Sequence, residues 1–208
     1  MDDNPPGIRR VCMAVGVEQY SEHSITEVAA ARRQLSALLA DLCESPEFDD
    51  LLPCQQSAGD GEVVVLPVGI DEPRTVTLLV NWLVHALRQT NGGWAGPHVR
   101  LRVAVHEGIT TLTGGVFDGP AVTKACRLLG ALPLSTALTS KPKADLAVLL
   151  SDRIYADLGD FGQYLPLEEF ISVEIGDPAA SSQEVGWLLI PEREAPDGAG
   201  QAPVVRNS

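Results

Sequence analysis

The chain begins with an apolar run that leads into an amphipathic segment. Val11–Val17 reads VCMAVGV, which predicts a buried strand. In the stretch SITE, Ser24 and Glu27 form a capping box, in which each side chain satisfies a backbone amide at the start of a helix. Apolar residues then recur at helical spacing on one face: Val28, Leu35, Leu38, Leu39 and Leu42. The pattern predicts a strand followed by an amphipathic helix.

A hairpin and a second helix are predicted next. The turn sequence AGDG and the β-rich run Glu62–Leu66 indicate the hairpin. Asp71 suits the cap of the helix, and Pro73 is tolerated in its first turn. The inner face of this helix carries an apolar stripe: Val76, Leu79, Val80, Leu83 and Leu87.

The second half of the chain continues with strands and short helices. Alternation in VRLRVAVHEG predicts a strand with Val99, Leu101, Val103 and Val105 on one face and Arg100, Arg102 and His106 on the other. The remaining segments predict a hairpin over ITTLTGGVF, a helix from Gly119, a strand over Ala147–Leu150, a helix capped by Ser151 or Asp152 that ends at Asp157, and strands over Ile171–Ile175 and Val185–Ile190.

The order strand, helix, strand, strand, helix, strand is typical of an α+β fold, a ferredoxin-like sandwich with an antiparallel-rich sheet and helices on one face. The other face would then be open and would need a partner or a ligand. We expect one domain over residues 10–190. Residues 1–9 and 191–208 are rich in Pro, Gly, Ala and charge, which predicts disordered tails.

Composition excludes several partners. The 208 residues include 28 acidic and 15 basic side chains, a net charge of −13, which repels nucleic acid and anionic membranes. The N-terminus MDDNPPGIRR has no apolar core of a signal peptide, and no run reaches the roughly 20 apolar residues that span a bilayer. We therefore expect a cytoplasmic protein. The widely spaced Cys12, Cys43, Cys54 and Cys126 predict buried free thiols and no zinc site.

Four segments resemble, in order and spacing, the class III nucleotidyl cyclase homology domain, the catalytic domain of adenylyl and guanylyl cyclases. They are VCMAVGVEQYS, AGDGEVVVLP, VRLRVAVHEG and VFDGPAVTKACRLLGAL, and ADLAVLLSDRIYADL fits a fifth. The resemblance spans Val11 to Ile190. The sequence is most similar to short stand-alone actinobacterial members of the family, which carry an insert like the one at 132–146. The resemblance implies a head-to-tail dimer with the active site between subunits, two Mg²⁺ or Mn²⁺ ions and a nucleoside triphosphate.

The resemblance places the two metal-binding Asp of the family at Gly16 and Asp60. Only Asp60 is an acid, and because Asp before Gly also suits a hairpin turn, both interpretations of Asp60 stay open. Glu18, two places after Gly16, is the substitute metal ligand that the chain offers. The phosphate-loop region falls on Val17, Glu18, Gln19 and Tyr20.

The other catalytic positions of the family also differ here. The purine-selecting residues fall on Gln56 and Val116, and the transition-state Asn falls on Thr123. The transition-state Arg is retained as Arg127, although a structural salt bridge would equally explain it. The late triphosphate-binding Lys should lie within residues 172–177, where no basic residue exists.

Four nearby residues have simpler interpretations. Lys124 fits a solvated surface charge, and His106 fits a structural role better than a catalytic one. Arg100 and Arg102 share one face of a strand, so they would either be exposed to solvent or pair with acids across a dimer interface.

We therefore expect a pseudo-enzyme: a degenerate cyclase-like domain that homodimerises and acts as a regulatory or nucleotide- or small-ligand-binding module. The alternative is an active class III cyclase that makes a 3′,5′-cyclic nucleotide from ATP or GTP. It would be a variant homodimer whose metals lie on Glu18 and Asp60, or the subunit that lends Arg127 to a heterodimer with an intact cyclase-like partner. A scaffold with an empty pocket is the third hypothesis.

Overall fold

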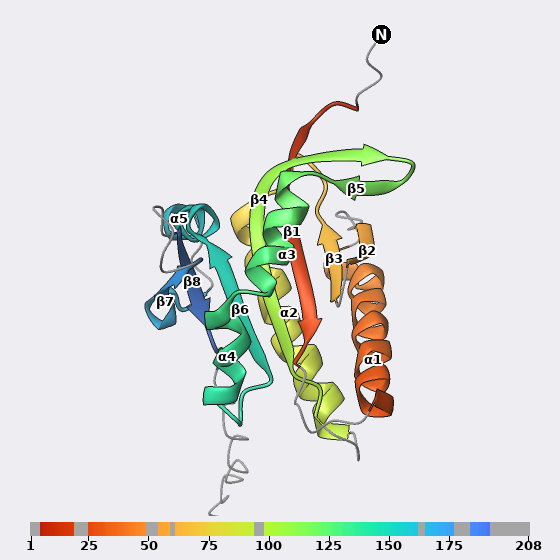
Figure 1. Ribbon diagram of the computed structural model, residues 1–208, viewed down its shortest axis with the longest axis vertical. Coiled ribbons are helices and arrows are strands. Elements are labelled where there is room, and N and C mark those ends of the chain that lie inside the picture. The colour runs from red at the N-terminus through yellow and green to blue at the C-terminus, as the bar shows by residue number, and fades with distance from the viewer. Residues whose placement is uncertain are drawn as a thin grey trace, which may run out of the picture.

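The computed structural model describes residues 5–18, 25–48, 54–58, 61–93, 98–161, 165–176 and 184–191. Within these ranges one mixed sheet has the strand order β2-β3-β1-β4-β6-β8-β7, and β5 pairs with β4 (Figure 1). The strands are β1 (Ile8–Val17), β2 (Cys54–Ala58), β3 (Gly61–Val65), β4 (Leu101–Thr113), β5 (Val116–Asp118), β6 (Leu146–Ser151), β7 (Ile171–Ile175) and β8 (Glu184–Leu189). The helices are α1 (Ile25–Glu44), α2 (Glu72–Gly93), α3 (Pro120–Leu129), α4 (Leu132–Ser140) and α5 (Asp152–Phe161), with 3-10 turns η1 (Pro46–Phe48) and η2 (Leu167–Glu169).

The centre of the sheet is formed by β1 and β4. Strand β1 runs antiparallel to β3 and β4, and β4 runs parallel to β6. Every residue of Val11–Val17 is buried, which confirms the predicted strand. The strand begins earlier, at Ile8, because residues 8–10 pair with residues 108–110 in the long extension of β4.

One face of the sheet is covered by α1, α2 and α5, which enclose the larger core. The predicted stripes of the first two helices point inward. Val28 is only half-buried, but the other residues of the stripes are buried: Leu35, Leu38, Leu39, Leu42, Val76, Leu79, Val80, Leu83 and Leu87. Asp71 caps α2, because its Oδ1 accepts a hydrogen bond from the Arg74 amide at 3.1 Å. The helical periodicity of the sequence is thus confirmed for both helices.

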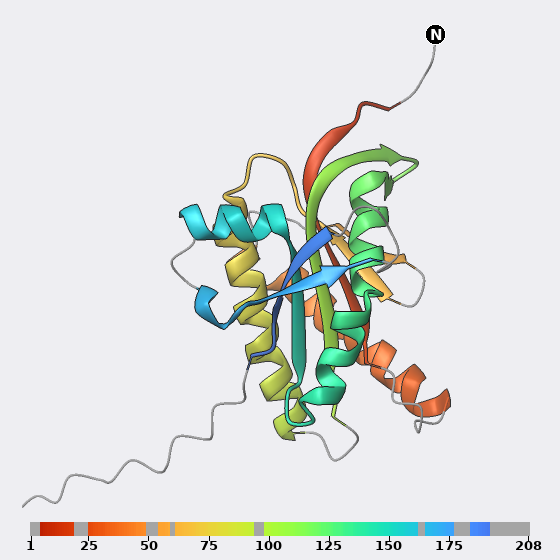
Figure 2. The ribbon, with the colours of Figure 1, turned by 60° about the vertical axis from the view of Figure 1, so that its left-hand side comes forward.

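The opposite face carries α3 and α4, so the expected open face was wrong, although the α+β class is confirmed. Figure 2 shows α2 and α3 on opposite sides of the strands. Cys12 and Ala14 of β1 pack with residues of α3, and Ala147 and Leu149 of β6 pack with residues of α4. Strands β1 and β6 are buried along long stretches, so apolar side chains point to both faces and both need a covering layer.

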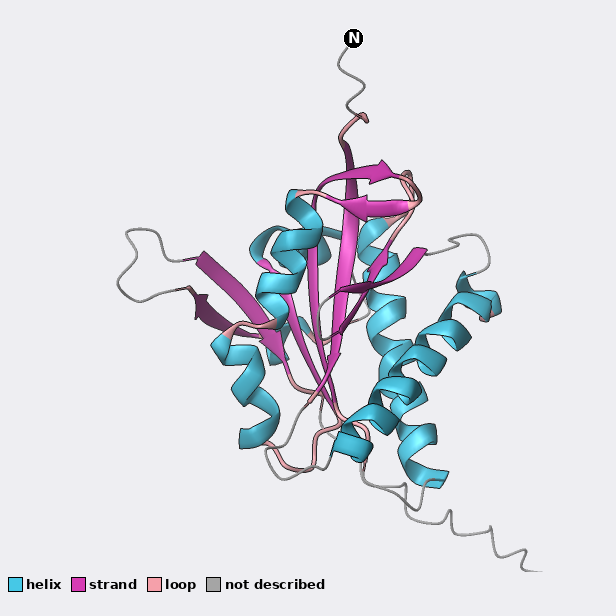
Figure 3. Cartoon of the chain, turned by 45° about the vertical axis from the view of Figure 1, so that its right-hand side comes forward, coloured by secondary structure: helices cyan, strands magenta, loops and turns pink. Residues whose placement is uncertain are grey.

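Both predicted hairpins are present. Strands β2 and β3 pair antiparallel, and the turn between them lies outside the described residues. Strand β4 turns through Gly114 and Gly115, whose φ values of 59° and 83° favour glycine, into β5. Figure 3 shows this β4–β5 hairpin at one end of the sheet.

The cysteines agree in part with the prediction of buried free thiols. Cys12 is a buried free thiol, and burial raises its pKa to about 12. Cys126 is also a free thiol, and both Cys43 and Cys126 are only half-buried. None of the helices described is both long enough and apolar enough to cross a bilayer.

Candidate functional site

The first predicted metal position, Gly16, lies beneath α3. It pairs with Arg102 of β4, and a β-carbon added to it would lie 3.3 Å from Cδ2 of Leu129. Gly16 has no side-chain oxygen to bind a cation. The face of β1 on which Gly16 lies is covered by Leu129, at the end of α3.

Glu18, the substitute ligand, is held inside the chain. It lies one residue past the end of β1, is 8% exposed, and has Oε2 at 2.9 Å from Nε of Arg102. Burial raises the pKa of Glu18, and the opposing effects of Arg102 and then Arg100 are smaller. This carboxylate is therefore paired with an internal cation.

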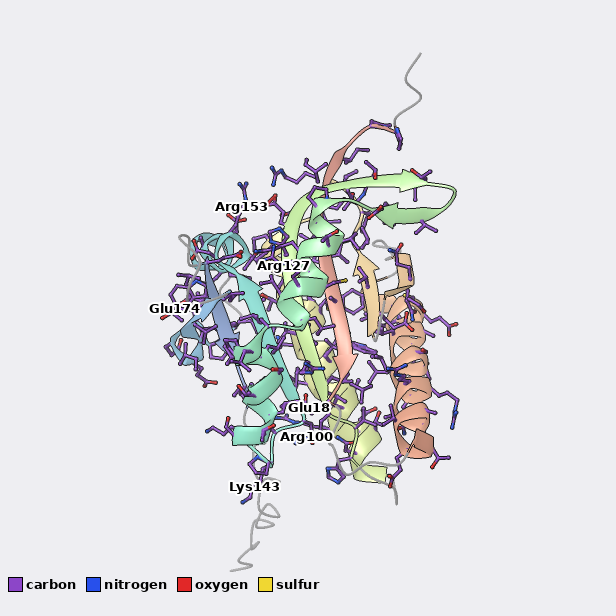
Figure 4. The ribbon with its side chains drawn as sticks, viewed as in Figure 1. Glu18, Arg100, Arg127, Lys143, Arg153 and Glu174 are labelled. Carbon is purple, nitrogen blue, oxygen red and sulfur yellow. The ribbon has the colours of Figure 1, made fainter. Side chains whose placement is uncertain are left out.

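Arg100 fastens α4 to the same end of the sheet. Its guanidinium donates hydrogen bonds to the carbonyls of Leu138, Lys141 and Ala144 at 2.6, 2.9 and 2.7 Å. Burial lowers the pKa of Arg100, and Glu18 opposes this effect. Figure 4 shows Glu18 and Arg100 close together at this end.

Neither interpretation of Arg100 and Arg102 from the sequence was correct. Arg100 is 6% exposed, and the Arg102 side chain is 19% exposed. Both find partners within the chain because α3 and α4 cover the face of β4 on which these arginines lie.

The two purine-selecting positions come together at the β4–β5 hairpin. The Gln56 side chain donates to the Phe117 carbonyl at 2.7 Å and accepts from the Phe117 amide at 2.9 Å. Val116, beside Phe117, is 56% exposed. The amide of Gln56 thus ties β2 to β5, and both its oxygen and its nitrogen are engaged in that contact.

The outer face of α3 carries the other predicted site residues. Thr123 and Arg127 lie one helical turn apart and are exposed. Lys124 forms an ion pair with Glu184 of β8 rather than standing free in solvent. In the part of the chain that the structure describes, Arg127 has no ion-pair partner.

Three predicted site residues, Gln19, Tyr20 and Asp60, lie outside the described residues. Val17 is buried in the core under α1 and α2, so its side chain faces away from Gly16 and Glu18. His106 has a buried Nδ1 that has no hydrogen-bond partner among the described residues. Burial, and next Lys124, lowers its pKa, which favours the neutral ring.

Sequence reasoning missed a charged cluster on the other face of the sheet. Glu107 is 4% exposed and pairs with Arg9 of β1 and with Nε of Arg153 of α5, the latter at 2.6 Å. Carboxylate oxygens of Glu72, Glu107 and Asp157 lie within 4.8 Å of one another. Figure 4 places Arg153 at the opposite end of the sheet from Glu18. The alternation in β4 was a usable signal, because it puts Glu107 on the inward face.

No family model and no curated protein matches the chain, but solved structures do. The adenylate/guanylate cyclase/hydrolase from Silicibacter pomeroyi is 18% identical, with a TM-score of 0.60 over 90% of this chain and 100% of that one. The dimeric guanylyl cyclase domain of the RhoGC fusion protein from the aquatic fungus Blastocladiella emersonii is 11% identical, with a TM-score of 0.55 over 89% and 97%. A bacterial light-regulated adenylyl cyclase is 12% identical, with a TM-score of 0.55 over 89% and 52%. The chain has the fold of a nucleotidyl cyclase domain. At these identities the likeness concerns the fold.

The described residues of this cyclase-like domain do not fit a metal pair at the end of β1. Mg²⁺ needs carboxylate oxygens that are free to coordinate it. Gly16 supplies none, and Glu18 is paired with Arg102. The carboxylate cluster on the other face is no substitute, since Arg9 and Arg153 already neutralise its buried member.

Proposed function

We propose that the chain is a cyclase-like domain that has lost two-metal catalysis and acts as a dimeric regulatory or ligand-binding module. One observation carries this proposal. Where a cyclase needs a free carboxylate at the end of β1, this chain has Gly16, and the neighbouring Glu18 is buried against Arg102. Coordination by Glu18 would require breaking a buried ion pair and leaving Arg102 without its partner.

Other residues support the same conclusion. The side-chain amide of Gln56 is hydrogen-bonded through both its nitrogen and its oxygen to the backbone of Phe117, so the edge of a purine would have to displace these bonds. Thr123 is shorter than the Asn that the resemblance implies. Residues 172–177, where the late Lys is expected, contain no basic side chain that could bind a triphosphate. In the family that the chain resembles, the position of Thr123 and that of the late Lys contact the charged phosphates in the transition state, and the position of Gln56 contacts the purine; the changes here remove these contacts.

A test of lost catalysis needs a control for contaminating enzymes. Purified protein is incubated with ATP or GTP and Mn²⁺, and cyclic nucleotide is measured by mass spectrometry. We expect none above the background of an Asp60→Ala variant. Product that forms with the natural sequence and disappears in the variant would overturn the proposal.

We place the dimer contact at the β4–β5 hairpin and the adjacent end of β1. Four apolar side chains there are strongly exposed: Ile8 (38%), Ile109 (39%), Leu112 (47%) and Val116 (56%). The register places Ile8 and Leu112 on one face of this extension and Ile109 and Val116 on the other. The extension therefore exposes apolar side chains on both faces, which is typical of an interaction surface. The sheet face that was expected to be open is not available as a dimer surface, since α3 and α4 cover it.

The dimer is tested by light scattering after size-exclusion chromatography. We expect a dimer for the natural sequence and a shift toward monomer for Leu112→Asp. Arg33→Gln, a charge change at an exposed position of α1, is the control and should stay dimeric. A monomeric natural protein would refute this part of the proposal.

A second candidate is supported by Arg127. Because this guanidinium is exposed and has no ion-pair partner among the described residues, it is free to enter the site of another subunit. The chain would then lend Arg127 to a heterodimer whose partner supplies both metal-binding acids. Co-purification from the native organism tests this candidate, and an Arg127→Ala variant should then lower the cyclase activity of the mixed complex.

A further inference from the structure

A cavity of about 210 Å³ lies between α3, α4 and β7. It is lined by Lys124, Arg127, Leu128, Ala131, Leu132, Ile175 and Gly176. Leu128 and Ile175 are buried and form an apolar floor, whereas Leu132 is 73% exposed and forms a protruding wall. The cavity is large enough for a small organic molecule, and its lining is mixed, with cationic side chains beside apolar ones.

Two of the described lining residues, Lys124 and Arg127, are charged, and both are cations. Lys124 is neutralised by Glu184, while Arg127 has no ion-pair partner among the described residues. Figure 4 labels Arg127 on α3 and Glu174 on β7. Glu174 does not line the cavity. In a protein of net charge −13, this unpaired guanidinium is a local site for an anion.

One wall of the cavity is formed by the start of α4, which packs on the sheet. Ala131 and Leu132 belong to the start of this helix, and Arg100 binds three carbonyls near its end. The α4 start also has no side-chain cap, so its positive dipole end adds to the charge of Arg127. Both walls are thus held by elements packed on the sheet.

We propose that this cavity binds a small organic anion, with its phosphate or carboxylate on Arg127 and its apolar body against Leu128, Leu132 and Ile175. This inference rests on the proposed ligand-binding role and names the ligand class. An inorganic anion leaves the apolar floor uncovered, and a neutral apolar molecule leaves Arg127 without a partner. We therefore expect the tightest binding from a molecule that carries both parts.

The test uses phenyl phosphate as the probe and benzoate as the carboxylate form. The control compounds are inorganic phosphate, which carries only the anionic group, and phenol, which carries only the aromatic ring. Chemical shifts of the isotope-labelled full chain are followed during titration. We expect saturable binding that shifts amides of residues 128–132 and 175–176, with at least about tenfold weaker binding of phosphate and phenol.

Two variants locate the site. Arg127→Gln should weaken phenyl phosphate binding about tenfold or more, because it removes a charge-assisted hydrogen bond. Arg33→Gln removes the same charge from exposed α1 and should leave binding unchanged. Both positions are exposed, so folding should not be affected.

The outcomes separate this inference from the proposed function. Absence of saturable binding by both probes, or binding that Arg127→Gln leaves unchanged, would overturn the cavity assignment. Cyclic-nucleotide formation by the natural protein would instead overturn the loss of catalysis, whether or not phenyl phosphate binds.

Discussion

Replacing Arg102 with Met is expected to destabilise the protein strongly. The variant keeps the length of the aliphatic stem but removes the cation at 2.9 Å from Glu18. Glu18 is 8% exposed, so its carboxylate would be left buried without its main partner. Removing one member of a buried ion pair costs about 3–5 kcal/mol, and we expect the lower end because Arg100 also lowers the pKa of Glu18.

The loss should depend on pH. The pKa of Glu18 is already raised above its ordinary value of 4.5, and without Arg102 it rises further. Because the pKa of Glu18 is raised in the folded state, its contribution to the free energy of unfolding is present below pH 4.5. This contribution is lost as the pH rises through the pKa that Glu18 has in the folded protein. Arg102→Met should therefore be more damaging near about pH 8 than near about pH 5.

Urea denaturation of a double-mutant cycle measures the pair directly. The proteins are the natural sequence, Arg102→Met, Glu18→Gln and the double variant, with Arg33→Gln as a surface control. We expect Glu18→Gln to restore part of the loss when combined with Arg102→Met, giving a clear coupling energy. A cost below about 1 kcal/mol with no coupling would refute the pairing, because it would be no larger than that of an exposed pair. Glu18 would then be free to bind a metal ion.

Three further predictions concern the covering layers. Arg100→Met should cost about 2–4 kcal/mol in urea denaturation and speed hydrogen exchange in α4, since three carbonyls lose a charged donor; slow exchange there would contradict it. His106 has a lowered pKa, so its stability contribution is present above about pH 6.5 and is lost as the pH falls through the folded value. His106→Gln should flatten this part of the curve of Tm against pH, and an unchanged curve would count against it. Leu83→Ala in the core should cost about 2–5 kcal/mol by urea denaturation, and a loss under 1 kcal/mol would argue against the packing of α2.

Local patterns were sufficient to predict most elements. The stripe on α2 and the buried run of β1 are properties of short segments, because the periods of 3.6 and 2 residues decide which side chains share a face. The absence of an acid at Gly16 and the presence of Arg127 are likewise read directly from the residues. The covering of both sheet faces was missed, although the apolar run of residues 146–150 in β6 carried that signal.

The pairings in the candidate site were decided by the tertiary structure. Arg102 meets Glu18, and Gln56 meets Phe117, across strands that are far apart in the chain. Such partners depend on strand order and register, which arise from contacts between distant segments rather than from local periodicity. By itself the sequence determined that a metal ligand is absent at Gly16. The fold determined that the remaining acid beside it is bound to an arginine, because a buried carboxylate is stable only with a partner.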